Sequence, residues 1–340
     1  MRRAGQLFDQ IVERDNLRLA FWKAARGKRD RTETREFESE LEQHLQRLRS
    51  GLLAGTFPVG RFQQFVIHDP KERVITAPCF EERVLHHAIM NVCEPVFERR
   101  LIDDTFACRV GRGRNAALRR AQHFAQGHAY FLKLDIRKYF DSISHARLME
   151  SLGVVFKDAR LLDWFGRIIH TYRGHHGQGL PIGSLMSQQF ANLYLGRFDR
   201  YIKETLRVRG YVRYMDDLAI WGDSSQSVRS LTADCAVFLQ DELSLEAKPP
   251  VVNRTGHGMD FLGCRIFPQR MELNRQSRVR FQRKLRLLEM YRETGAMAEQ
   301  QIQQRMTSLV AFTRGDVSSW CFRNSAIERL QGHGHKARTG

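Results

Sequence analysis

The feature that most constrains this chain is a pair of adjacent acids between two hydrophobic segments. Residues 211–214 and 218–221 are rich in aromatic and β-branched side chains, and Asp216 and Asp217 stand between them. Two such segments separated by a few polar residues predict a β-hairpin with both acids at its tip. Adjacent carboxylates repel each other unless a cation neutralises them. The alternative is an ordinary solvated Asp-Asp turn, which is common in hairpins.

A third acid stands at the end of another predicted strand. Residues 130–135 form a hydrophobic run that ends in Asp135. Carboxylate oxygens are the ligands that hard divalent cations prefer. Three carboxylates that converge from two strands can hold two Mg²⁺ ions, an arrangement that serves nucleotidyl transfer. We therefore predict that Asp135, Asp216 and Asp217 are the catalytic residues and the metal ligands.

The charge of the chain indicates a nucleic-acid partner. Its 340 residues include 55 lysines and arginines against 38 acids, which gives a net charge of +17. A surplus of this size is typical of proteins that bind polyanions. No apolar run has the length of a membrane span, and the first residues lack the apolar segment of a secretory signal. We therefore expect a cytoplasmic protein with no membrane partner.

The cysteines and histidines do not predict a metal site of their own. The six cysteines show no C-x-x-C spacing, so we expect reduced and mostly buried thiols rather than a zinc site. Two histidine clusters stand at residues 175–176 and 333–335. We expect them to be loop and tail residues, with metal binding as the alternative.

Hydrophobic periodicity predicts a mixture of strands and helices along the rest of the chain. We expect strands over residues 62–67, from residue 73 and over 261–267, with the first two forming a hairpin. We expect helices over residues 6–26, 35–53, 81–102, 158–172, 185–207 and 226–243, another from Ser144, and helical structure after Pro268. This order favours an α+β core with an appended helical domain.

Six segments, in order, resemble the motifs of reverse transcriptases. Tyr214–Asp217 (YMDD) resembles the Y-x-D-D box, and residues 131–143 (FLKLDIRKYFDSI) resemble the first catalytic palm motif. The other four are Lys71 and Arg73 in the fingers hairpin, residues 109–113 in the next fingers motif, 179–188 in the nucleotide pocket and 261–266 in the strand that grips the primer.

The resemblance implies an α+β right-hand polymerase fold, with fingers, a palm built on an antiparallel sheet, and a helical thumb. The expected boundaries are 1–60 for an N-terminal helical extension, 61–130 for the fingers, 131–267 for the palm with fingers-derived helices around 150–180, 268–330 for the thumb and 331–340 for a flexible tail. It also implies two Mg²⁺ ions, with Mn²⁺ as an alternative ion and the Ile136 carbonyl as a further ligand.

The resemblance also implies the residues that contact the substrates. The expected dNTP-binding residues are Lys71, Arg73, Phe140, Ile182, Gly183 and Gln188. Phe140 would exclude the 2′-hydroxyl, although core packing is its alternative role and Tyr139 suits that role equally well. Template–primer contacts are expected from Arg109, Arg112, Tyr214, Met215, Leu262, Gly263, Arg275, Arg278, Arg280 and Arg283. Residues 275–286 carry six basic residues and no acid, as a helix that follows a phosphate backbone would.

The pocket motif resembles one subfamily most. Group II intron and retroviral enzymes usually carry Pro-Gln-Gly there, whereas this chain has Pro181-Ile182-Gly183 followed by Ser187-Gln188. This signature resembles the reverse transcriptases of diversity-generating retroelements, in the group II intron-like bacterial lineage. The resemblance implies error-prone cDNA synthesis from a template-repeat RNA, with errors at adenine, and a pentameric accessory variability protein. Because Ile182 cannot hydrogen-bond a base, we expect relaxed base selection.

Other interpretations remain at this point. Residues 111–116 fit the G-x-G-x-x-A pattern of dinucleotide-binding folds, with Asp135 about 20 residues later. The chain could also be a catalytically dead RNA-binding module, or a group II intron-like or phage-defence reverse transcriptase. Lys248 could protonate pyrophosphate, although Pro249-Pro250 departs from the family pattern.

Overall fold

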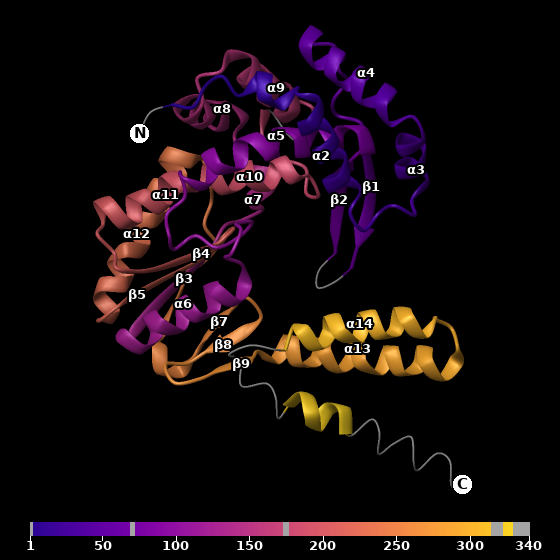
Figure 1. Ribbon diagram of the computed structural model, residues 1–340. Helices are drawn as coiled ribbons and strands as arrows, with labels where there is room; N and C mark the ends of the chain where they lie inside the picture. Colours follow the sequence, from indigo (N-terminus) through magenta and orange to yellow (C-terminus); the bar gives the residue numbers. More distant parts are fainter. Residues whose placement is uncertain (1–2, 69–71, 173–176, 314–321, 329–340) are drawn as a thin grey trace. The chain divides into compact units, whose positions relative to one another are not determined.

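The computed structural model describes residues 3–68, 72–172, 177–313 and 322–328 (Figure 1). Its contacts divide the chain into two compact units that alternate along the sequence. The first unit consists of Met1–Arg109, Ile136–Leu206 and Asp234–Lys248, and the second of Val110–Asp135, Arg207–Ala233 and Pro249–Gly340. The helices and antiparallel strands of the two units confirm the expected α+β class.

A four-stranded antiparallel sheet forms the centre of the second unit. Its order is β4-β5-β3-β6, from β3 (Tyr130–Asp135), β4 (Gly210–Tyr214), β5 (Asp217–Gly222) and β6 (Val251–Arg254). The hairpin predicted around the two acids is therefore confirmed. Helix α6 (Arg114–Gly127) packs against β4 and β5. All pairs in this sheet are antiparallel, which excludes the parallel sheet of a dinucleotide-binding fold.

The strand predicted over residues 261–267 is wrong. The chain instead forms two short strands, β7 (Met259–Phe261) and β8 (Cys264–Ile266), joined by a tight turn. Leu262 and Gly263 make this turn with φ values of 48° and 79°. The apolar Leu262 continues the hydrophobic run, so periodicity alone does not show the reversal. The purely helical structure predicted after Pro268 is also interrupted, because β9 (Met271–Leu273) pairs with β8.

Helices complete the second unit after β9. Helix α13 (Arg275–Thr294) begins at Asn274, whose side chain accepts a hydrogen bond of 2.9 Å from the Ser277 N–H, and ends before Gly295 at φ 65°. Helix α14 (Glu299–Ala311) packs against α13. Residues 322–328 form a further helix, and Ala326 joins Phe281 and Leu285 of α13 in a buried cluster.

The first unit is built around α5 (Phe80–Glu98), which ends four residues earlier than predicted. Three helices from the N-terminal region pack against it, namely α1 (Phe8–Ile11), α2 (Arg14–Ala25) and α3 (Thr32–Ser39). The two long helices predicted here are each broken, at residues 12–13 and at Glu40, after which α4 (Leu41–Ala54) follows. Across Glu40 the buried Phe37 and Leu45 are eight residues apart, which keeps the helical spacing and hides this second break in the sequence.

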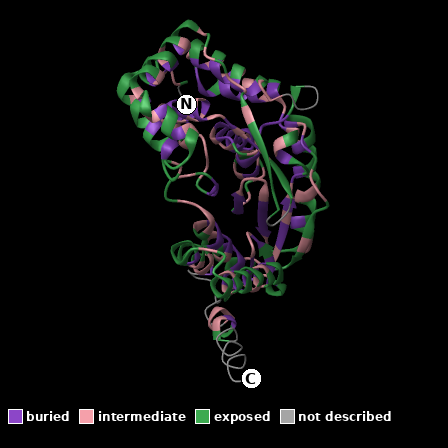
Figure 2. Cartoon of the chain, turned by 90° about the vertical axis from the view of Figure 1, so that its right-hand side faces the viewer, coloured by how far each residue is buried: buried purple, intermediate pink, exposed green. Residues whose placement is uncertain are grey.

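Shorter elements fill the rest of the first unit. They are β1 (Phe62–Ile67), β2 (Arg73–Pro78), α7 (Tyr139–Ser142), α8 (His145–Val155), α9 (Ala159–His170), α10 (Leu185–Tyr194), α11 (Gly196–Arg200) and the π-helix η2 (Tyr201–Thr205). The predicted hairpin of β1 and β2 is confirmed, and most of β1 is exposed to solvent (Figure 2). The single helix predicted over residues 185–207 is divided into α10, α11 and η2.

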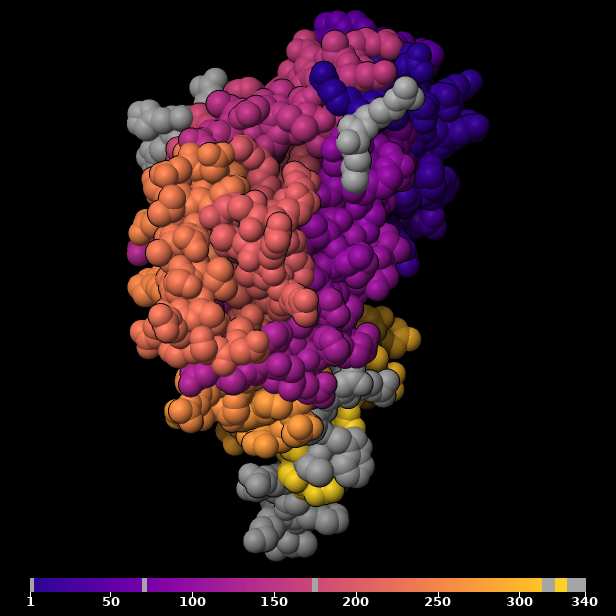
Figure 3. All heavy atoms as spheres, turned by 90° about the vertical axis from the view of Figure 1, so that its left-hand side faces the viewer, coloured from indigo at the N-terminus to yellow at the C-terminus, as the bar shows by residue number. Residues whose placement is uncertain are grey.

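Helix α12 (Ser225–Leu243) runs from the second unit into the first. It confirms the helix predicted over residues 226–243, and its outer side is exposed on the face shown in Figure 3. The 3₁₀ turn Thr255–His257 follows β6. Within the described ranges, none of the helices combines the length and the apolar character that a membrane crossing requires.

Candidate active site

The antiparallel register places two of the predicted catalytic acids opposite each other. Asp135, the last residue of β3, pairs with Asp217, the first residue of β5. Residues paired in this way project from the same face of a sheet, with Cβ atoms roughly 4.5–5.5 Å apart. Asp216 stands next to them, in the two-residue turn that the Tyr214–Asp217 pair closes. The backbone ladder thus brings all three acids to one end of the sheet.

The turn that carries Asp216 is held in an uncommon conformation. Its first residue, Met215, has a φ of 55°, a region that residues other than glycine rarely occupy. The fully buried Arg213 donates a hydrogen bond of 3.3 Å from Nη1 to the Met215 carbonyl. Strained backbone of this kind concentrates at functional sites, where surrounding contacts hold it in place.

Lys133 also lies beside the acids, and sequence reasoning missed it. Its Nζ is 3.5 Å from Oδ1 of Asp217. Residues two apart in a strand share a face, so the position of Lys133 relative to Asp135 was the available signal. Its ammonium offsets part of the repulsion between the paired carboxylates.

The donor chemistry of this sheet end fits a hard divalent cation. Among the described residues, no three His, Cys, Asp or Glu side chains form a ready-made cage for one ion. Mg²⁺ seldom uses such a cage, because it keeps several waters and takes one or two carboxylates together with substrate phosphates. The paired Asp135 and Asp217, with Asp216 beside them, match that type of site.

In the first unit, the predicted nucleotide-pocket loop is anchored to β2. The Thr76 N–H of β2 donates a hydrogen bond of 2.7 Å to the Ile182 carbonyl. Gly183 has a φ of 117°, and a Cβ there would lie 2.6 Å from Cγ2 of Ile75. Only glycine fits this position. Gln188 accepts a hydrogen bond of 3.3 Å from the Cys108 thiol.

The neighbouring dNTP-binding candidates differ in exposure. Tyr139 is buried and its hydroxyl donates to the Ala191 carbonyl, whereas Phe140 is half-buried. Tyr139 therefore packs in the core, and Phe140 is the better candidate for contact with a sugar. Arg73 is exposed on β2, and Lys71 lies outside the described residues.

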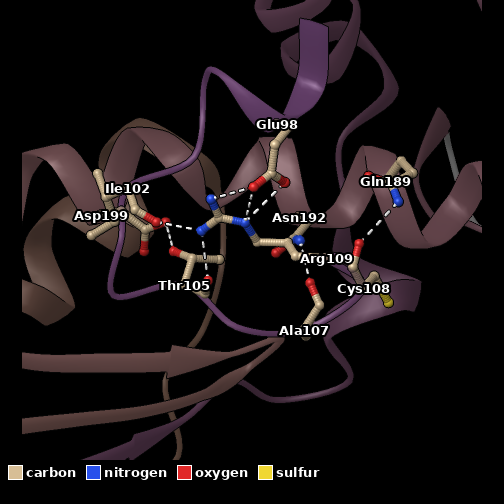
Figure 4. A network of polar contacts seen from close by, with 9 residues as sticks. All are labelled: Glu98, Ile102, Thr105, Ala107, Cys108, Arg109, Gln189, Asn192 and Asp199. Carbon is tan, nitrogen blue, oxygen red and sulfur yellow. Dashed lines mark hydrogen bonds and ion pairs between the residues drawn. The ribbon is translucent and has the colours of Figure 1, made fainter. Parts of the chain in front are cut away.

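The structure corrects the interpretation of Arg109. Its side chain is only 4% exposed and forms an ion pair with Glu98. Its Nη1 donates to the carbonyls of Ile102 and Thr105, at 2.5 and 2.6 Å (Figure 4). These contacts stabilise the segment between α5 and α6, and they leave the guanidinium no surface for a template or primer.

The other template–primer candidates lie in the second unit with varied surroundings. Arg275 and Arg283 are exposed on α13, whereas Arg278 is half-buried and forms an ion pair with Glu272. Tyr214, Leu262, Gly263, Arg112 and Arg280 are all half-buried. Arg114, which the sequence did not single out, donates from Nε to the Leu262 carbonyl at 2.9 Å and so supports the β7–β8 turn.

The remaining sequence candidates are the cysteines, the histidine clusters and Lys248. Cys93, Cys235 and Cys264 are buried thiols, as expected, whereas Cys79 is half-buried and Cys108 exposed. Burial raises the pKa of Cys235 to about 12. Both histidine clusters lie outside the described residues, and Lys248 is half-buried, with its proposed role still a prediction.

Sequence comparisons match this chain to a known protein family. A family model described as "Reverse transcriptase (RNA-dependent DNA polymerase)" matches residues 68–266, more than half of the chain. Protein YkfC of Escherichia coli is 25% identical over 286 residues, which are 68% of this chain and 74% of YkfC. The group II intron-encoded protein LtrA of Lactococcus lactis is 24% identical over 47% of this chain and 28% of its own length.

Solved structures include an apo telomerase from Candida tropicalis. It aligns with a TM-score of 0.47 and 14% identity, over 63% of this chain and 55% of the telomerase chain. The present chain thus spans about half of that telomerase chain and about a quarter of LtrA.

Proposed function

The chain belongs to the reverse transcriptase (RNA-dependent DNA polymerase) family, and from this premise we propose that it extends a primer 3′-hydroxyl with dNTPs on an RNA template. The observation that carries the proposal is the register of β3 and β5, which sets Asp135 opposite Asp217 beside Asp216. Lys133 next to Asp217 and the buried Arg213 beneath the Met215 turn support these acids.

Asp135, Asp216 and Asp217 would hold two Mg²⁺ ions, with the Ile136 carbonyl as a further ligand. The ions would lower the pKa of the attacking hydroxyl and stabilise the leaving pyrophosphate. The protein itself supplies position: the strand pair fixes two carboxylates, and the Met215 turn fixes the third. The exposed arginines of α13 would contact the backbone of the template–primer duplex, and Arg73 and Phe140 the incoming nucleotide.

We further propose that the enzyme belongs to a diversity-generating retroelement and copies a template-repeat RNA with errors at adenine. Support comes from the motif at residues 179–188, in which Ile182 replaces the usual glutamine. An apolar side chain offers no hydrogen bond to a base, and apolar pockets discriminate weakly. A pentameric accessory protein would assemble with it, and the net charge of +17 suits the RNA.

A group II intron-like reverse transcriptase is the second candidate, favoured by the similarity to LtrA. The two candidates differ in fidelity, so the test is the sequence of the cDNA. The enzyme is given an RNA template with all four bases, Mg²⁺, the accessory protein and its cognate RNA. Errors concentrated at template adenine, and reduced in Ile182→Gln, support the retroelement enzyme. Accurate cDNA supports the group II type, and no synthesis at all supports a catalytically dead RNA-binding module.

A further inference from the structure

Three buried polar side chains connect α5 to the nucleotide-pocket loop of the first unit. Glu82 and His86 lie one turn apart on α5, and Ser184 stands at the start of α10. Their exposed fractions are 0%, 1% and 2%. Buried polar groups cost free energy unless they are paired, so a linked set of three calls for an explanation.

The three side chains form a continuous line. Oε2 of Glu82 accepts hydrogen bonds from the N–H groups of Gly60 and Arg61, at 2.8 and 3.3 Å. Its other oxygen, Oε1, lies 3.6 Å from Nε2 of His86. Nδ1 of His86 lies 3.4 Å from Oγ of Ser184. The line therefore runs from the start of β1, through α5, to the end of the loop.

Burial affects the protonation of both titratable side chains in this line. Burial lowers the pKa of His86 to about 3, so its imidazole is neutral near pH 7, with one donor and one acceptor nitrogen. Burial also raises the pKa of Glu82. The Ser184 hydroxyl can donate to or accept from Nδ1 of His86, so this hydrogen bond exists in either tautomer, whereas Nε2 of His86 and Oε1 of Glu82 are buried without a hydrogen-bond partner among the described residues.

Ser184 does not cap its own helix, although it stands at the capping position. A serine just before a helix usually accepts a hydrogen bond from the helix's own first N–H groups. Ser184 makes no such bond to α10, and its hydroxyl faces His86 instead. In contrast, Ser144 at the start of α8 accepts the usual bond from Arg147. This difference shows that the Ser184 contact is not a by-product of helix capping.

A serine, a histidine and a glutamate in line also suggest a hydrolytic triad, but the surroundings exclude it. The cavity beside them has a volume of about 10 Å³ and is lined by the three polar side chains themselves and by apolar ones that include Phe62, Ile168 and Phe190. A space of this size takes about one water molecule and no substrate. The role of these three side chains is therefore within the protein itself, not in a reaction with a substrate.

We propose that the Glu82–His86–Ser184 line is a positioning device for the loop 181–184, and that it sets the affinity and base selection for the incoming dNTP. This inference rests on the proposed polymerase function. On one side, the Thr76 N–H donates to the Ile182 carbonyl, and Ile75 leaves no room for a Cβ at Gly183. On the other side, His86 holds Ser184. Since Ile182 cannot hydrogen-bond a base, the loop backbone is what remains to fix the geometry of the pocket.

The test compares Ser184→Ala and His86→Gln with a matched control. Ser151→Ala removes another hydroxyl of the first unit, one that bonds only to the Arg147 carbonyl within α8. Steady-state incorporation of each dNTP opposite each RNA base gives KM, kcat and the error spectrum. We expect both line variants to raise KM for dNTPs about 3- to 10-fold, the effect of one lost neutral hydrogen bond, and to change the error spectrum. We expect kcat to stay within about twofold, as in the control.

Two results would overturn the inference. One is a KM and an error spectrum in both line variants that equal those of Ser151→Ala. The other is a fall in kcat that follows a fall in melting temperature, since this indicates a purely structural role. Failure of the proposed function is distinct, because wild-type protein would then incorporate no dNTP at all, and the inference would fall with it.

Discussion

The acid-bearing sheet end and the loop 181–184 are held in place by different means. Main-chain pairing positions Asp135 and Asp217, so their relative placement depends little on neighbouring side chains. The loop depends instead on a glycine with a φ of 117° and on a buried serine that faces a histidine. Changes at the sheet end should therefore affect the chemical step, whereas changes at the loop should affect nucleotide affinity and selection.

The largest effect is expected from the acids themselves. Asp217→Asn should lower the single-turnover rate of dNTP incorporation by about 10³-fold or more, because a metal-binding carboxylate is lost. The melting temperature should not fall, since the repulsion from Asp135 is relieved. Asp260→Asn, at an exposed acid of β7, is the control and should keep the wild-type rate. A rate for Asp217→Asn within tenfold of wild type would contradict this assignment.

The next largest effect is expected from Gly183→Ala, which changes the loop 181–184. Its Cβ would meet Ile75 at 2.6 Å, on a backbone that side chains rarely tolerate. We expect a loss of roughly 1–3 kcal/mol in the free energy of unfolding, and a raised KM for dNTPs. Gly27→Ala offers the matched control, since its φ is 69° but nothing lies within 4 Å of the added Cβ. Equal effects of the two substitutions on KM would show that the Ile75 contact is irrelevant.

A smaller effect is expected from the exposed arginines of α13. Arg275→Ala and Arg283→Ala should each weaken binding of an RNA–DNA duplex a few-fold, about equally for all sequences. Each should also reduce the slope of log affinity against log salt by about one. Fluorescence anisotropy over a salt series measures both quantities, with the exposed Arg229→Ala on α12 as the comparison. An unchanged slope in the α13 variants would remove these residues from the duplex contact.

A further effect concerns stability against pH. The pKa of His86 is lowered to about 3 by burial, so the unfolded state binds more protons between pH 6.5 and pH 3. Stability is therefore complete above pH 6.5 and is lost as the pH falls, by up to about 1.4 kcal/mol per pH unit. His86→Gln should flatten this slope in urea unfolding at pH 7.5, 6.5 and 5.5. His87→Gln should flatten it about as much over this range, because burial also lowers the pKa of His87, to about 4. Identical slopes in wild type and His86→Gln would refute this linkage.

The sheet end was predictable from sequence because its information is local. Runs of hydrophobic residues on both sides of Asp216-Asp217 define a hairpin by themselves. The turn at Leu262 was missed because an apolar residue occupies a left-handed position there. The role of Arg109 was also misjudged, because a basic residue in a motif gives no sign of a buried Glu98 partner.

The support of the loop could not be predicted for a different reason. Glu82 and Ser184 are about 100 residues apart in sequence, and only the packing of α5 against α10 brings them together. Neither residue type is typical of a core, so hydrophobic periodicity gives no signal for the pair. Long-range pairing of buried polar groups is visible only in three dimensions.

The most direct test of the catalytic assignment is single-nucleotide extension of a primer annealed to RNA, with the accessory protein and cognate RNA present. Wild-type protein should add the nucleotide with Mg²⁺, lose this activity when the metal is chelated by EDTA, and regain it when Mg²⁺ is restored. Asp217→Asn should remain inactive under all three conditions while binding the duplex normally. Extension that persists in EDTA, or that Asp217→Asn retains, would contradict a metal-dependent polymerase centred on Asp135, Asp216 and Asp217.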